Sequence, residues 1–139
     1  MRGLRRIWVL CVVAFLAGLS GSASAKLVNK KMKAKKGTPL YAVTESLKLI
    51  AADKHDEWME KWCDKKTACS GRATRARVML DIAKKKITKG CVKKNKVYVV
   101  QITEKMNGKW MILTKCGDKR TVTFSLQKRD GKWKVRGLS

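Results

Sequence analysis

The sequence lacks the motifs that most directly indicate catalysis. It contains one histidine, His55, and neither a glycine-rich phosphate loop nor a cluster of metal ligands. We find no nucleophile beside a base and no two carboxylates that the pattern places on one inward face. Asp56 and Glu57 follow His55 as first-turn acids, which a helix dipole favours, so His55 is interpreted as structural. The sequence therefore predicts no catalytic residue, no cofactor and no metal.

Acidic residues are also scarce. The 139 residues include 34 lysines and arginines but only 10 aspartates and glutamates, a net charge of +24. Such a charge repels itself, so packing or cross-links must hold the compact state together. It also predicts attraction to anionic polymers or to an anionic membrane or envelope surface.

Long apolar runs are absent except near the amino terminus. Three arginines there precede the apolar stretch Ile7 to Leu19, and the small residues Ala23-Ser24-Ala25 follow it. The stretch is too short to cross a bilayer comfortably. We therefore expect residues 1–25 to be a cleaved signal peptide, with export to a periplasm or to the outside of the cell. Without it the chain keeps a net charge of +21.

Cysteine pairs with the C-x-x-C spacing of a zinc knuckle are missing. Cys11 lies in the expected signal peptide, and four cysteines follow it. An even number in a small exported domain indicates two disulfides. Of the three pairings we favour Cys63–Cys69, which closes a short loop, with Cys91–Cys116 tying two strands together. The alternative, a zinc site made by all four thiolates, has less support because the knuckle spacing is absent.

The last third of the chain has the pattern of an antiparallel sheet. Thr121 to Gln127 alternates strictly between polar and apolar residues, which is typical of a strand with one buried face. Asp130-Gly131 is a two-residue hairpin signal, and Lys132 to Val135 alternates again after it. Asn107-Gly108 joins two further strands in the same manner. This stretch predicts the sheet around which the rest of the chain packs.

The boundaries of the upstream strands follow from the same signals. We expect strands at Val97–Glu104 and Lys109–Thr114, and a first strand at Ile87–Lys94 followed by a turn at Asn95-Lys96. The apolar residues expected to share faces are Tyr98, Val100 and Ile102, then Trp110 and Ile112, then Val122, Phe124 and Leu126, and finally Trp133 and Val135.

Three helices are expected before the sheet. Thr38-Pro39 opens the first, with threonine as the cap and proline at the first helical position, and a turn at Asp53-Lys54 ends it. A short second helix carries Trp58 and Trp62, interpreted as core residues, with a ligand-stacking platform as the alternative. A third helix runs from Ser70-Gly71 to about Lys86, with apolar residues on one face.

Two lysine-rich segments stand out. Residues 26–37 have six lysines and no acid, which predicts a disordered basic arm before a domain at residues 38–139. Lys84 to Lys96 has seven lysines and no acid, and it belongs to the folded domain. Both segments are interpreted first as solvated faces, and alternatively as sites for polyanions. The candidate polyanion-binding residues are Lys30, Lys31, Lys33, Lys35, Lys36, Lys84, Lys85, Lys86, Lys89, Lys93, Lys94 and Lys96.

Helices followed by a curved antiparallel sheet, ending in Asp130-Gly131-Lys132-Trp133-Lys134-Val135, form an order that resembles the nuclear-transport-factor-like (cystatin-like α+β) superfamily. Within it, the chain is similar to small exported bacterial domains of unknown function. The resemblance implies a cone of sheet around a helix, a pocket suited to a small apolar ligand, and dimerisation through the open sheet face. Because this fold does not fix a function, the leading hypothesis is a non-catalytic binding module. The alternatives are a polyanion-binding protein and a small isomerase, hydrolase or dehydratase that uses the pocket.

Overall fold

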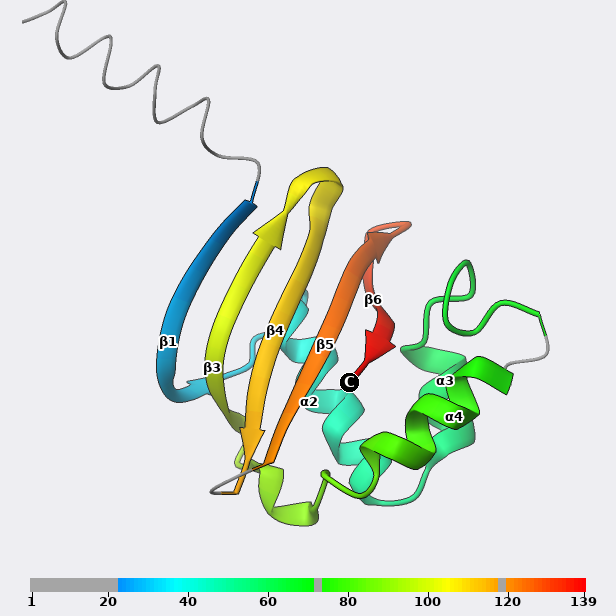
Figure 1. Ribbon diagram of the computed structural model, residues 1–139, viewed down its shortest axis with the longest axis horizontal. Helices are drawn as coiled ribbons and strands as arrows, with labels where there is room; N and C mark the ends of the chain where they lie inside the picture. The colour runs from blue at the N-terminus through cyan, green and yellow to red at the C-terminus, as the bar shows by residue number, and fades with distance from the viewer. Residues whose placement is uncertain (1–22, 72–73, 118–119) are drawn as a thin grey trace, which may run out of the picture.

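The computed structural model describes residues 23–71, 74–117 and 120–139. Within them, three α-helices pack with a six-stranded antiparallel sheet, an α+β architecture (Figure 1). The strands are β1 (Ala23–Lys33), β2 (Val92–Lys93), β3 (Lys96–Lys105), β4 (Lys109–Cys116), β5 (Arg120–Arg129) and β6 (Lys132–Leu138). The helices are α2 (Pro39–Ala51), α3 (His55–Lys61), α4 (Thr74–Ala83) and the 3₁₀ turns η1 (Lys89–Cys91) and η2 (Met106–Gly108). The strand order is β1-β3-β4-β5-β6, and β2 also pairs with β3.

The hairpins form where the turn residues predict them. Asp130 and Gly131 have φ values of 52° and 77°, the left-handed backbone that a two-residue turn between twisted strands requires. The turn at Asn107 and Gly108 is also left-handed. Val122, Phe124 and Leu126 of β5 are fully buried, so the alternation in this strand correctly predicts its inner face.

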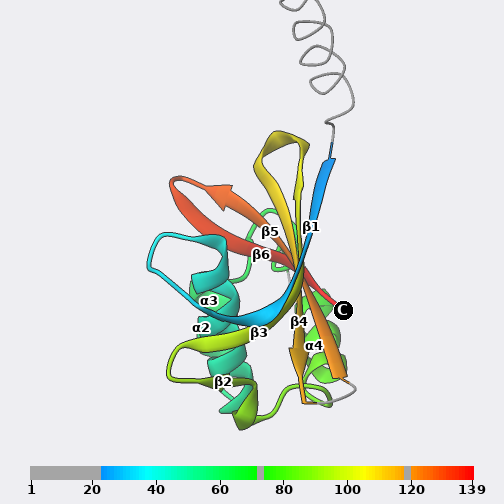
Figure 2. The same ribbon diagram turned by 90° about the vertical axis from the view of Figure 1, so that its left-hand side faces the viewer.

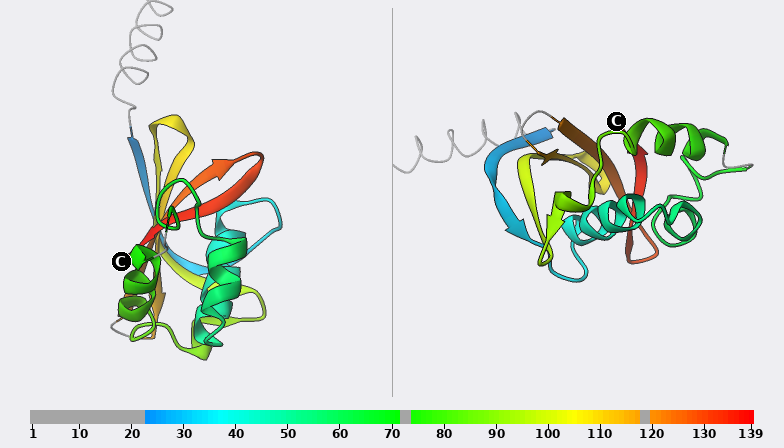
Figure 3. Two further views of the ribbon diagram at one scale, coloured as in Figure 1. Left: turned by 90° about the vertical axis from the view of Figure 1, so that its right-hand side faces the viewer. Right: turned by 90° about the horizontal axis from the view of Figure 1, so that it is seen from below.

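The sheet curves around α2 (Figure 2), and α3 packs against α2. Thr38 caps α2 as predicted, because its Oγ1 accepts a hydrogen bond of 3.3 Å from the backbone N–H of Tyr41. Four apolar residues of α2 are buried, namely Leu40, Val43, Leu47 and Ile50. The third helix, α4, packs beside β6 (Figure 3). No helix in the described part of the chain is long and apolar enough to span a membrane.

The predicted disordered arm is instead largely an ordered strand. β1 pairs with β3 from Ala23 opposite Lys105 to Lys33 opposite Lys96. The pairing uses backbone groups, which lysine supplies as well as any other residue, so an edge strand needs little apolar side-chain area. In β1 only Val28 and Met32 pack against the core. The prediction of disorder is therefore wrong for this segment.

A bulge in β3 changes which residues face the core. The pairing of β3 with β4 shifts between Val99 and Gln101, so Val100 is an extra residue in the strand. Val97 and Val99 are buried, and Tyr98 lies on the opposite, outer face. The prediction that Tyr98, Val100 and Ile102 share one face is wrong, because simple alternation does not anticipate a bulge. The expected strand before β3 is also shorter: it is β2, preceded by η1 and followed by a turn at Lys94 and Asn95.

Both favoured disulfides are present. Cys63 and Cys69 have Cα atoms 5.9 Å apart, and Cys91 and Cys116 have theirs 4.7 Å apart. The four cysteines of the zinc alternative are thus paired in two disulfides. Cys91 lies in η1 and not in a strand, so the second disulfide joins η1 to the end of β4.

Candidate functional site

Five lysines gather around Tyr98 on the outer face of the sheet. They line a cleft of about 620 Å³ together with Tyr98, Gly90, Cys91 and Gly117. No acidic side chain is among the described residues that line this cleft. We call the five lysines the lysine cluster; its members are Lys31, Lys93, Lys94, Lys96 and Lys115.

Strand register brings the lysine cluster together from four strands. Lys31 of β1 and Lys115 of β4 both lie opposite Tyr98 of β3, which makes one row across the sheet. Lys33 of β1 and Lys93 of β2 both lie opposite Lys96 of β3, which makes a second row. Tyr98 and Lys96 are two residues apart on one strand, so the two rows share a face.

This arrangement costs free energy in the absence of an anion. Like charges directly opposite each other in a sheet destabilise the pairing, and the second row consists of three lysines. Lys94 also has a φ of 53°, a left-handed conformation that is unfavourable for a residue with a long side chain. One lysine has an attractive partner, because the Nζ of Lys115 lies 5.7 Å from the centre of the Tyr98 ring.

Covalent and hydrogen-bonded contacts hold the cluster in place. The Cys91–Cys116 disulfide joins the segment that leads into β2 to the strand that carries Lys115. The turn between β2 and β3 is fixed at Asn95, whose carbonyl accepts a bond of 3.0 Å from the N–H of Ala34 and whose side chain accepts one from Lys48. The charges are therefore arranged before any ligand arrives.

Only some of the twelve candidate lysines lie at the cleft. Four of them belong to the lysine cluster, and Lys33 is in register with it. Lys84, Lys85 and Lys86 follow α4 and do not line the cleft. The others outside the cleft lining are Lys30, Lys35, Lys36 and Lys89. Lys115 was not a candidate. It alternates with the buried Ile112 and Thr114 and so lies on the outer face of β4, but only the register with β3 places it beside Tyr98.

A second cleft, which we call the aromatic cleft, lies between the start of α2, the end of α3 and the β5–β6 hairpin. It has a volume of about 520 Å³, and its aromatic lining is formed by Tyr41, Trp62 and Trp133. The sequence offered Trp58 and Trp62 as a pair, either core or ligand platform. The structure separates them, because Trp58 is fully buried whereas Trp62 lines the cleft.

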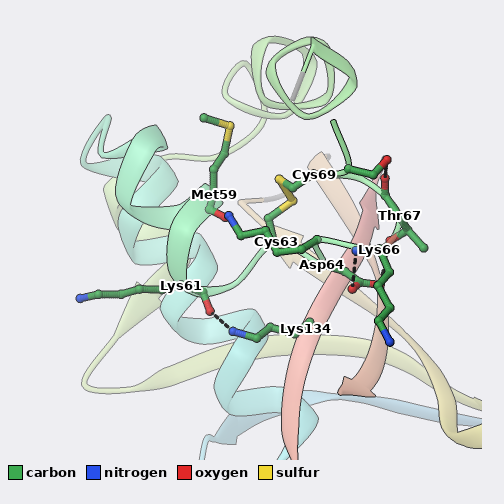
Figure 4. Close-up of a disulfide and its surroundings, with 10 residues drawn as sticks. Met59, Lys61, Cys63, Asp64, Lys66, Thr67, Cys69 and Lys134 are labelled. Carbon is green, nitrogen blue, oxygen red and sulfur yellow. Dashed lines mark hydrogen bonds between the residues drawn. A yellow bond between two sulfur atoms is a disulfide. The ribbon is translucent and has the colours of Figure 1, made fainter. Parts of the chain in front are cut away.

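Two titratable side chains, His55 and Asp64, lie outside the lining of both clefts. His55 begins α3, and its Nε2 lies 3.4 Å from the Oδ1 of Asp53. Asp64 is nearly fully buried beside the Cys63–Cys69 disulfide. Its carboxylate accepts hydrogen bonds from the N–H of Lys66 and the hydroxyl of Thr67 (Figure 4). These contacts fix the fold of the disulfide loop.

No known protein family, curated protein or solved structure matches the chain. In residues 23–71, 74–117 and 120–139, no group of three or more His, Cys, Asp or Glu side chains is placed to hold a metal ion.

Proposed function

We propose that the chain is an exported binding protein that holds anionic polymers at the lysine cluster. The observation that carries the proposal is the row of three lysines directly opposite one another, Lys33, Lys96 and Lys93. A row of like charges is unfavourable in the free protein, and a bound chain of anionic groups would relieve it. Binding and folding then favour the same arrangement of strands.

The expected recognition is of charge and not of sequence. Lysine ammonium groups act as compact point charges with rotatable donors, which suits phosphate, sulfate or carboxylate groups without a fixed orientation. Among the described residues that line this cleft Tyr98 is the one aromatic, so they offer no run of rings on which successive bases stack. Affinity should therefore fall steeply as salt is added.

The proposal also covers the export of the protein and the superfamily to which its fold is related. Two disulfides are compatible with an oxidising location, and the amino-terminal segment has the pattern of a signal peptide. An antiparallel sheet that curves around α2 supports kinship with the nuclear-transport-factor-like superfamily.

The test compares two triple variants in binding to a fluorescent oligothymidylate, used as a generic polyanion, across a salt titration. One variant removes three cluster charges (Lys31→Gln, Lys93→Gln, Lys96→Gln). We expect the slope of log affinity against log salt to become shallower by about 2, since each contact to a single strand contributes about 0.7. The same variant should also unfold at a higher temperature than the wild type, because the repulsion in the second row is gone.

The matched control removes three exposed lysines elsewhere (Lys54→Gln, Lys66→Gln, Lys128→Gln) and has the same net charge. It should keep nearly the wild-type slope, and unlabelled polyphosphate should displace the probe from both the wild type and the control. Equal losses in the two triple variants would show that net charge alone attracts the polymer, and the proposed site would be abandoned.

A further inference from the structure

We propose that the aromatic cleft is a second binding site, which takes an acidic sugar unit. It shares no lining residue with the cleft of the lysine cluster, so this inference does not rest on the proposed function. Three segments far apart in the sequence supply its walls. The lining residues are Gly37, Thr38 and Tyr41 around the start of α2, Glu60, Lys61 and Trp62 at the end of α3, and Gly131, Lys132, Trp133 and Lys134 in the β5–β6 hairpin.

The ring geometry suits a puckered ligand better than a flat one. The rings of Tyr41 and Trp62 are 5.9 Å apart and inclined by 69°, so they meet edge to face and do not form a parallel slot. Trp133 is supported from behind by Trp110, at the same separation and inclination. A sugar ring has C–H groups on its faces, which pack favourably against the electron-rich faces of aromatic rings, and hydroxyl groups around its edge. The volume of about 520 Å³ is within the range of small-ligand sites and accommodates one or two sugar units.

The polar lining favours a ligand that carries a negative charge. Among the described lining residues there are three lysines and one acid, Glu60. The lysines are Lys61, Lys132 and Lys134. Lys61 has an ion pair of 2.8 Å with Glu57, so a ligand would be bound by Lys132 and by the N–H donors of Lys134 that its bond to the Lys61 carbonyl does not use. Burial, together with the nearby charges of Lys132 and Lys65, lowers the pKa of Lys134, and a carboxylate placed beside it would offset this shift by stabilising the ammonium form. Glu60 supplies acceptor oxygens for sugar hydroxyls.

The walls of the aromatic cleft are fixed relative to one another. The N–H of Val135 donates a bond of 2.7 Å to the carbonyl of Trp62, which joins the end of α3 to β6. The ammonium group of Lys134 donates to the carbonyl of Lys61, a contact drawn in Figure 4. Thr38 caps α2 at the third wall. A site held in this way loses little conformational freedom when a ligand binds.

The experiment is a titration of the oxidised protein with D-glucuronate, followed by tryptophan fluorescence and by ligand-detected NMR. We expect a saturable change with glucuronate and at least threefold weaker binding of D-glucose, which has the same ring without the carboxylate. Trp133→Ala should weaken glucuronate binding roughly tenfold. Lys132→Ala, a change at an exposed residue, should reduce the preference for glucuronate over glucose.

Trp110→Phe is the matched control, because Trp110 packs against Trp133 but does not line the cleft. This variant should change the affinity for glucuronate less than threefold. The absence of a saturable response to glucuronate in the wild type would overturn the inference. So would unchanged affinity in both Trp133→Ala and Lys132→Ala, or tighter binding of benzoate, a flat anion, than of glucuronate. Each of these results leaves polyanion binding at the lysine cluster unaffected, so the two proposals fail separately.

Discussion

Reduction of both disulfides is expected to unfold the protein at low ionic strength. Constraining the unfolded chain contributes about 2 kcal/mol for a cross-link over 6 residues and about 3.5 kcal/mol for one over 25. Small domains have a total stability of about 5–15 kcal/mol, and this one must also overcome the repulsion of a strongly positive chain. Circular dichroism of oxidised and reduced protein, followed on heating, measures the difference.

Added salt should partly restore the reduced protein, because it screens the repulsion between exposed lysines. The variant Cys91→Ser with Cys116→Ser should lose more stability than Cys63→Ser with Cys69→Ser, since it opens the longer loop. It should also bind polyanions more weakly, because η1 is no longer tied to β4 beside the lysine cluster. A reduced protein that melts at the same temperature as the oxidised one would contradict this account of stability.

Replacement of Asp64 by Asn is expected to cost about 2–3 kcal/mol of unfolding free energy at neutral pH. The Asp64 side chain is only 2% exposed, and its Oδ2 accepts bonds from the Thr67 hydroxyl at 2.9 Å and from Arg129 at 3.2 Å. An amide in its place would direct N–H groups at these donors or leave them unpaired. Asp81→Asn, an exposed change on α4 with the same effect on net charge, should cost less than about 0.5 kcal/mol.

The cost of Asp64→Asn should depend on pH. Burial alone would raise the pKa of Asp64, but hydrogen bonds from the Lys66 N–H, Thr67 and Arg129 outweigh it and hold the pKa below the usual 3.8. A carboxyl whose pKa falls on folding stabilises the protein above its unfolded value, and the stabilisation is lost as the pH falls through the folded value. Urea unfolding of the wild type and the variant should therefore differ at pH 7 and converge below about pH 4. A difference that is constant with pH would show that the charge of Asp64 contributes nothing.

The parts of the fold that were predictable are those whose signals are local. The β5–β6 hairpin has an alternating strand on one side and Asp130-Gly131 at its turn, and both signals act within a few residues. Thr38-Pro39 marks the start of α2 for the same reason. The disulfide pairing followed from loop length and an even cysteine count.

The parts that were missed depend on partners far away in the chain. β1 is a strand because the edge of β3 is free to pair with it, and its own lysine-rich sequence resembles a disordered segment. The bulge at Val100 turns Tyr98 outward, and only the register with β1 and β4 then places Lys31 and Lys115 beside it. The aromatic cleft likewise needs Tyr41, Trp62 and Trp133 from three separate segments. A candidate site of this kind is a property of the assembled sheet.

The most direct test of the lysine cluster is a map of amide NMR shifts during titration of the oxidised protein with polyphosphate. We predict that the largest changes fall on Lys31, Tyr98, Lys115 and the turn from Lys93 to Lys96, with saturation at one polymer site. Residues near exposed lysines on other faces, such as Lys54 and Lys128, should change little. Shifts spread evenly over all exposed lysines, or centred on Lys84 to Lys86, would contradict the proposal that the cluster is the binding site.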